Sequence, residues 1–256
     1  MRVSTSLRKS LLQYLYHEAN EIIDAARGEI FIGVFSQRRF NPIFCAFEQM
    51  RRHIGKIYSI EGKYVMNINR LDNGWRARKS AAGGGALIDM GYHYIDLLVW
   101  YFGVPDSVTA RISRANRIGQ EYDVEDTANM LFDYCLSDSY EEKTIGNIII
   151  SRVYPFKEEK LSVYGTDGYI ELQRGLIRRM NSRGEEVERL ASKRGWPSAF
   201  TDQLEFFAKE IRSGKRCGPT TGHEHLKHIA TLEAAYASDR SHTSCNPNTY
   251  LAKFTK

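Results

Sequence analysis

The residues best suited to chemistry lie in one short stretch, where Asp89 and His93 follow three consecutive glycines, Gly83 to Gly85. A four-residue spacing puts two side chains on the same face of a helix, so a helix here would bring the carboxylate and the imidazole together. Histidine is the side chain that titrates closest to neutral pH, and a nearby carboxylate can orient it and raise its basicity. The pair therefore predicts proton transfer to or from a bound substrate.

The elements that must position this pair are predicted from apolar periodicity. Apolar spacing, closed by Gly103 and Pro105, predicts a helix over residues 86–102 that carries both side chains. Many short strands joined by turns rich in Gly, Asp and Ser predict an α+β fold, with a large, mostly antiparallel sheet and helices on one face. The predicted strands cover residues 55–69, 108–113, 127–134, 147–153, 160–164, 169–172 and 176–181.

Helices are also predicted near both ends of the chain. Helical spacing over residues 7–27 and an apolar run at residues 29–36 predict one helix followed by one strand. Residues 70–82 are expected to form a polar loop, and the last residues to be irregular. The other predicted helices cover residues 42–52, 199–213 and 223–238.

Composition describes an ordinary globular protein. The 256 residues are 42% hydrophobic and 26% charged, with a net charge of +5. The basic residues are scattered and form no long stripe, which argues against nucleic-acid binding. No signal peptide or apolar run of membrane-spanning length is evident, so we expect no membrane association and a cytoplasmic protein. The four cysteines form no Cys-x-x-Cys pair and are expected to be free thiols: Cys45, Cys135, Cys217 and Cys245.

Residues 83–96 read Gly-Gly-Gly-x-Leu-x-Asp-x-Gly-x-His-x-x-Asp, and this pattern resembles the signature of the Gfo/Idh/MocA oxidoreductases. The resemblance covers about residues 18–240, because further motifs occur in the family's order. They are Arg39-Phe40-Asn41-Pro42, Ile54-Gly55-Lys56-Ile57, Trp75-Arg76, Tyr164-Gly165-Thr166-Asp167-Gly168 and Glu233-Ala234-Ala235-Tyr236-Ala237-Ser238.

The resemblance implies an NAD(P)-dependent dehydrogenase or reductase acting on sugars, cyclitols or related polyols. It implies that His93 acts as acid/base on the substrate and that Asp89 positions the substrate or tunes the histidine. Trp75 and Arg76 are expected to contact substrate; the alternative is a tryptophan that packs the loop and an arginine paired with an acid. Tyr92 and Tyr94 flank the histidine, and one is expected in the core and the other in the pocket, with Tyr92 as the candidate substrate contact. Family members pair through the open face of the sheet, so it also implies a homodimer or higher oligomer.

The dinucleotide-binding half of such an enzyme is not evident in the sequence. No Gly-x-Gly-x-x-Gly loop occurs, because Ile88 stands where the third glycine would follow Gly83 and Gly85. The family's Glu-Lys-Pro matches Arg8-Lys9-Ser10, which makes Lys9 a candidate catalytic residue. Residues 1–37 are thus expected to be a remnant of the dinucleotide-binding domain, and residues 38–256 the substrate and oligomerisation domain.

The substrate-binding motif is present and the dinucleotide-binding loop is not evident, and two functions are compatible with this combination. The first is the substrate-binding half of an oxidoreductase whose NAD or NADP lies on a missing region or on a separate Rossmann-bearing partner, so that this chain alone binds no cofactor tightly. The second is a non-catalytic ligand-binding or scaffold module derived from the same family.

Other titratable groups are expected to be structural. The zinc-protease pattern fails at Lys227, so His225 and His228 are expected to lie at the start of a solvated helix and to bind no metal. Asp96 is expected to form a cap or an ion pair on a helix surface. Structural roles are also expected for Arg39 and Phe40, and for Glu125 in a turn.

Overall fold

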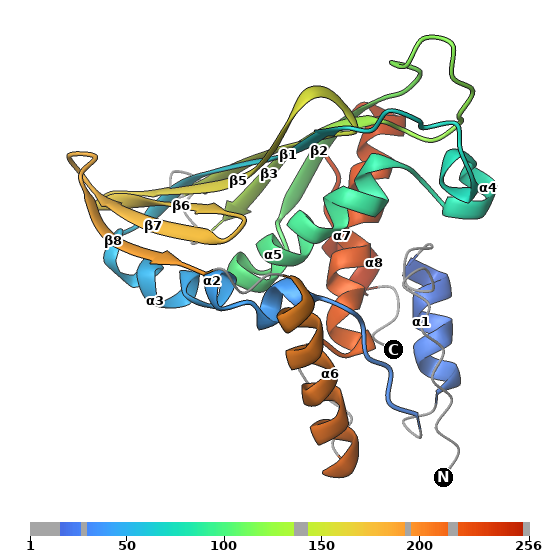
Figure 1. The fold of residues 1–256 in the computed structure, drawn as a ribbon. Helices are drawn as coiled ribbons and strands as arrows, with labels where there is room; N and C mark the ends of the chain where they lie inside the picture. Colours follow the sequence, from blue (N-terminus) through green and yellow to red (C-terminus); the bar gives the residue numbers. More distant parts are fainter. Residues whose placement is uncertain (1–15, 27–29, 136–142, 193–195, 215–219, 253–256) are drawn as a thin grey trace.

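The computed structural model describes residues 16–26, 30–135, 143–192, 196–214 and 220–252. Its centre is an eight-stranded sheet in the order β2-β3-β4-β1-β5-β6-β7-β8, with helices on one face (Figure 1). Strands β1 and β4 run parallel, and the remaining neighbours are antiparallel. The predicted fold class is thereby confirmed. The strands are β1 Ile57–Asn67, β2 Ser107–Ser113, β3 Thr127–Cys135, β4 Lys143–Ser151, β5 Val153–Gly165, β6 Gly168–Gln173, β7 Leu176–Asn181 and β8 Glu186–Ala191.

Side-chain alternation along the strands explains why one face of the sheet holds the core. In β3, Met130 and Phe132 are buried, whereas Leu131 between them is exposed. Successive side chains of a strand point to opposite faces, so the alternating apolar residues form one buried layer. Helices α5 (Tyr92–Phe102) and α7 (Gly222–Ser241) lie on that side of the sheet (Figure 1).

The remaining helical elements are mostly short. The predicted helix at 42–52 is a run of three short pieces that begins at Pro42, with Asn41 as its N-cap. The expected loop at 70–82 contains two short helices. The helices and helical turns not yet given are α1 Tyr16–Ala25, α2 Pro42–Cys45, α3 Phe47–Met50, α4 Lys79–Ala82, α6 Trp196–Arg212, α8 Asn248–Ala252, η1 Gln37–Phe40, η2 Arg51–His53, η3 Trp75–Ala77 and η4 Leu87–Gly91.

Three predictions of local structure were wrong. Residues 30–36 do not form a strand of the sheet; they run extended, with one isolated bridge between Gly33 and Thr221. Strand β8 was missed because all its residues are exposed and it lacks an apolar face. The chain end expected to be irregular contains α8.

The described part of the N-terminal region packs on the C-terminal helix. Tyr16, Ala19 and Ile23 of α1 form a buried cluster with Leu226 and Ile229 of α7. This packing covers an apolar helix face that would otherwise need a partner. Among the cysteines in the described residues, Cys45, Cys135 and Cys245 are free thiols, as expected, and Cys217 lies outside these residues.

Candidate active site

The three glycines fit a crowded turn. Gly83 ends α4 in the left-handed conformation, with φ of 76°. A Cβ on Gly85 would lie 1.9 Å from the carbonyl oxygen of Glu125, and one on Gly84 would lie 2.4 Å from the Tyr236 hydroxyl. The space beside these two glycines is therefore filled by protein, and they form no cradle for a phosphate group.

Glu125 fixes the start of the helical segment that carries the candidate pair. Its buried carboxylate accepts hydrogen bonds from the backbone N–H of Gly85 at 2.7 Å and of Leu87 at 3.0 Å. The Tyr236 hydroxyl donates to the same oxygen at 2.7 Å. An acidic side chain is favourable at the N-terminus of a helix, where backbone N–H groups lack partners. Glu125 is therefore more than a turn residue.

Asp89 lies in η4, a π-helical turn, and His93 lies in the first turn of α5. A π turn has i→i+5 hydrogen bonds, so a four-residue spacing does not align the two side chains as in a regular α-helix. The Asp89 carboxylate instead accepts a hydrogen bond from Nη2 of Arg152 at 2.8 Å. Arg152 is buried, and its guanidinium also donates to the Gly85 carbonyl.

Two exposed side chains from the preceding loop lie beside Asp89. Arg76 stacks over the Trp75 ring, with 4.5 Å from its Cζ to the ring centroid. Its Nε lies 3.9 Å from Oδ1 of Asp89. The structure thus brings together three predicted site residues, Trp75, Arg76 and Asp89, with Arg152 as a fourth member that the sequence analysis did not identify.

The other predicted site residues lie elsewhere or outside the described residues. His93 is half-buried, and its ring lies 5.9 Å from that of Tyr92. Tyr92 itself is buried, and its hydroxyl lies 2.5 Å from Nδ1 of His225. Lys9 lies outside the described residues, so its catalytic role stays a prediction.

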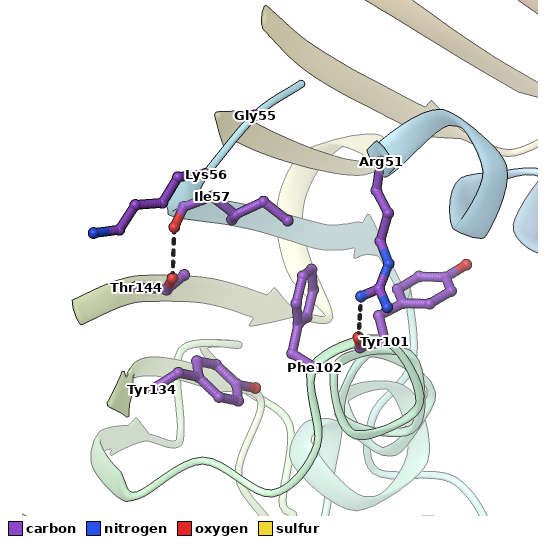
Figure 2. Close-up of a pocket in the computed structure, with 8 residues that line it drawn as sticks. All are labelled: Arg51, Gly55, Lys56, Ile57, Tyr101, Phe102, Tyr134 and Thr144. Carbon is purple, nitrogen blue, oxygen red and sulfur yellow. Dashed lines mark hydrogen bonds between the residues drawn. The ribbon is translucent and has the colours of Figure 1, made fainter. Parts of the chain in front are cut away.

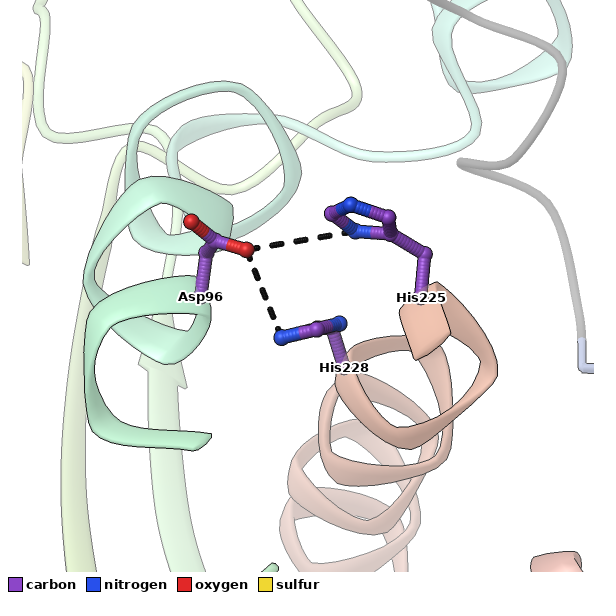
Figure 3. A group of neighbouring side chains, drawn as sticks. All are labelled: Asp96, His225 and His228. Atoms are coloured by element: carbon purple, nitrogen blue, oxygen red, sulfur yellow. Dashed lines mark ion pairs between the residues drawn. The ribbon is translucent and has the colours of Figure 1, made fainter. Parts of the chain in front are cut away.

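A buried polar cluster lies between α5 and α7, where Asp96 of α5 faces His225 and His228 of α7 (Figure 3). Arg39 binds Asp96 through Nη2 at 2.9 Å and also lies 2.8 Å from Nε2 of His228. Ser36 donates to Oδ1 of Asp96 at 3.1 Å. The expectations of a solvated histidine pair and a surface Asp96 were wrong, because the packing of α7 against α5 encloses all three side chains.

The hydrogen bonds of this cluster determine where its protons lie. Arginine only donates, so Nε2 of His228 accepts from Arg39. Since the Ser36 proton goes to Asp96, Nε2 of His225 donates to Ser36 at 3.3 Å, and Nδ1 of His225 accepts from Tyr92. Every one of these bonds is made with both histidines neutral.

The pKa shifts agree with neutral histidines and a charged Asp96. Burial lowers the pKa of His228 to about 4, and burial followed by the neighbouring His228 lowers the pKa of His225 well below its usual value. Burial alone would raise the pKa of Asp96, but Arg39, then His228 and His225, outweigh it and lower that pKa to about 2. At neutral pH, Arg39 therefore balances the charge of Asp96.

A carboxylate and two imidazoles at such short range form a set of potential metal ligands. Here the guanidinium of Arg39 binds both Oδ1 of Asp96 and Nε2 of His228, which are the atoms whose lone pairs a metal would need. The arginine thus takes the place of the cation, and the geometry favours a structural polar cluster.

A pocket of about 380 Å³ opens at the opposite end of α5 (Figure 2). None of the predicted site residues lines it. Arg51 donates to the Tyr101 carbonyl, and Thr144 donates to the Ile57 carbonyl, so these polar groups are used within the fold. The lining residues are Arg51, Gly55, Lys56, Ile57, Tyr101, Phe102, Tyr134 and Thr144.

Comparison with known proteins identifies the family. Residues 50–171, which contain Trp75, Arg76, Asp89 and His93, match the GFO/IDH/MocA C-terminal domain. Residues 50–171 therefore belong to the C-terminal domain of the Gfo/Idh/MocA oxidoreductase family.

Curated relatives share only part of their length with this chain. An oxidoreductase of Formosa agariphila is 27% identical over 113 residues, which are 41% of this chain and 35% of that protein. An uncharacterised oxidoreductase of Schizosaccharomyces pombe is 27% identical over 122 residues, 46% of this chain and 32% of that protein. The matched stretch spans about a third of these relatives.

Solved structures confirm the fold over most of the chain. A levoglucosan dehydrogenase in complex with NADH and levoglucosan superposes with a TM-score of 0.77 at 18% identity, covering 91% of this chain and 71% of that one. An aldose-aldose oxidoreductase from Caulobacter crescentus superposes with a TM-score of 0.76 at 19% identity, covering 91% of this chain and 69% of that one. Within the residues that the structure describes, no helix is long and apolar enough to cross a membrane.

Proposed function

We propose that this chain forms the substrate-binding part of an NAD(P)-dependent dehydrogenase or reductase that acts on a sugar, cyclitol or related polyol. The observation that carries the proposal is the partly exposed cluster of Trp75, Arg76 and Asp89 beside the start of the helix that bears His93. Support comes from the domain match over these residues and from the similar structure of a levoglucosan dehydrogenase in complex with NADH and levoglucosan.

His93 and the residues of the cluster each have a proposed role. His93 exchanges the proton of a substrate hydroxyl, because imidazole can accept and release protons near neutral pH. Asp89, held in place by Arg152, accepts hydrogen bonds from substrate hydroxyls. Trp75 and Arg76 form the outer wall of the site. Tyr92 is buried and bonded to His225, so we do not include it among the proposed substrate contacts.

The glycine turn, within the described residues, does not fit the phosphates of a nicotinamide cofactor. Hydride exchange with a polyol needs such a cofactor, but the glycine turn has no room for a phosphate and no Gly-x-Gly-x-x-Gly loop occurs. We infer that NAD or NADP is held by a dinucleotide-binding domain outside these residues, for example on a partner polypeptide. We also propose that residues 1–37 are a remnant of such a domain and that the substrate domain follows at residues 38–256.

The substrate site is tested by NMR titration of the histidine ring resonances with a panel of sugars and cyclitols. We expect saturable shifts of the His93 resonances, with exposed His53 in η2 as the internal control. If no polyol perturbs His93, the alternative of a non-catalytic module is favoured.

The cofactor inference is tested by calorimetric titration of NADH and NADPH into the purified chain. We expect no tight binding, and no reduction of NAD or NADP by the chain alone with any polyol of the panel. Micromolar binding would show that this chain contains a dinucleotide site after all and would overturn the inference.

A further inference from the structure

The proposed substrate site carries more positive charge than a neutral sugar requires. Arg76 and Arg152 share the single carboxylate of Asp89. Arg152 makes the close contact at 2.8 Å and is almost fully buried, with 4% of its side chain exposed. Asp89 is thus neutralised from inside the protein, and the charge of Arg76 remains as the surplus.

Arg76 is held ready to bind a ligand. Its side chain is 55% exposed, and it rests on the half-exposed Trp75 ring. The 3.9 Å from its Nε to Asp89 is longer than a hydrogen bond, so the carboxylate does not engage that nitrogen directly. Stacking on an aromatic face restricts a guanidinium without using its N–H donors. The donor groups of the guanidinium therefore stay available to a ligand beside Asp89.

The loop around Arg76 adds to this positive charge. Residues 70–79 contain four basic side chains and one acidic side chain, Asp72. Asp72 is bound by both ends of the Arg70 guanidinium, at 2.8 and 3.1 Å. Arg78 and Lys79 are exposed on the same loop. Asp123, the nearby acid, accepts a hydrogen bond from the backbone of Lys79.

We infer that the substrate of this site is a sugar acid, a polyol that bears a carboxylate which the Arg76 guanidinium binds. The inference rests on the proposed function, and it names the substrate class of that same site. A planar guanidinium and a carboxylate match in a two-bond arrangement that also orients the substrate. Of the four basic side chains of residues 70–79, Arg76 is the one that lies against Asp89. One arginine at this position balances one carboxylate, whereas a phosphate would bring about two negative charges.

The test compares two ligands with the same carbon skeleton, gluconate and the neutral polyol glucitol, by calorimetry and by the His93 resonances. We expect gluconate to bind about 10- to 100-fold more tightly, which is the range for a hydrogen bond to a charged group. Arg76→Gln should abolish this preference, and Arg76→Lys should restore part of it. Arg78→Gln removes the same charge from an exposed position two residues away and should keep the preference.

The possible results separate the two proposals. If glucitol binds as tightly as gluconate and Arg76→Gln changes neither affinity, the substrate is not a sugar acid. The proposed polyol site is then still supported. If glucose 6-phosphate binds more tightly than gluconate in an Arg76-dependent way, the carboxylate assignment is overturned in favour of a phosphate. If none of the three ligands perturbs His93, the proposed polyol site fails, and the acid inference fails with it.

Discussion

Asp96 illustrates how burial changes the behaviour of ordinary titratable residues. On a surface helix it would pair with little effect on stability, since exposed ion pairs contribute about 0–1 kcal/mol. Here it is enclosed with Arg39, His225 and His228. Removing one partner from such a buried pair typically costs about 3–5 kcal/mol, because the other charge is left uncompensated. The cluster therefore joins η1, α5 and α7 through charge as well as packing.

The buried histidines predict a pH-dependent stability. His228 has its pKa lowered from 6.5 to about 4, so the unfolded chain binds more protons than the folded chain between these values. Stability therefore falls as pH decreases through this window, by on the order of 2–3 kcal/mol for this residue. The lowered pKa values of His225 and Asp96 act in the same direction, the latter at lower pH.

Urea unfolding of the wild type and of His228→Gln at pH 7 and pH 5 measures this effect. The variant, which is itself less stable at pH 7, should lose less stability between the two pH values than the wild type. Exposed His53→Gln is the matched control and should leave the difference unchanged. Equal losses in the wild type and His228→Gln would show that His228 is not held neutral by the fold.

At the scale of elements, the candidate site depends on the close packing of the glycine turn against the turn before β3. Gly85 donates its N–H to the Glu125 side chain while its Cα faces the Glu125 carbonyl. The π-helical η4 then continues directly into α5, which carries His93. Turns of this kind are often found at functional sites, where they change the direction of side chains.

Gly85→Ala should destabilise the protein and displace this turn. The new Cβ would lie 1.9 Å from the Glu125 carbonyl oxygen, so backbone must move. Overpacking of this type costs about 1–3 kcal/mol. Thermal unfolding measures the loss. Gly146→Ala is the control, because its Cβ would lie 3.6 Å or more from its neighbours, and a similar loss there would contradict the packing argument.

At the scale of the whole molecule, the sheet face opposite the helices is partly apolar. Leu131 of β3 and Ile145 of β4 are both more than half exposed. They lie on the same face as diagonal neighbours, because Asp133 is the register partner of Ile145. We propose that a second copy of this chain covers this face, since exposed apolar patches on sheets commonly mark interaction surfaces.

Light scattering at micromolar concentration tests this interface. The wild type should be a dimer or a higher oligomer, and the double variant Leu131→Glu, Ile145→Glu should be a monomer with unchanged helix and strand content. Ile118→Glu, on a fully exposed loop position, should remain associated. A monomeric wild type would contradict the proposed pairing.

The sequence by itself determined the features that depend on local patterns. Alternating apolar residues predicted β1, because a half-buried strand repeats every two residues. Further short strand patterns joined by turns predicted β2 to β7 and the class of the fold. The glycine-to-histidine motif predicted the family, which the domain match over residues 50–171 bears out. Strand β8 was missed because it is exposed on all sides and has no such repeat.

Only the tertiary structure decided which distant residues meet. Arg152 lies 63 positions after Asp89 in the chain, and His225 lies 189 positions after Ser36, so no local spacing reveals either contact. The burial of Asp96, His225 and His228 likewise depends on the packing of α7 against α5. The residue type of a charged side chain does not show whether that side chain is exposed or buried. Only the fold determines its partners, its pKa and its role.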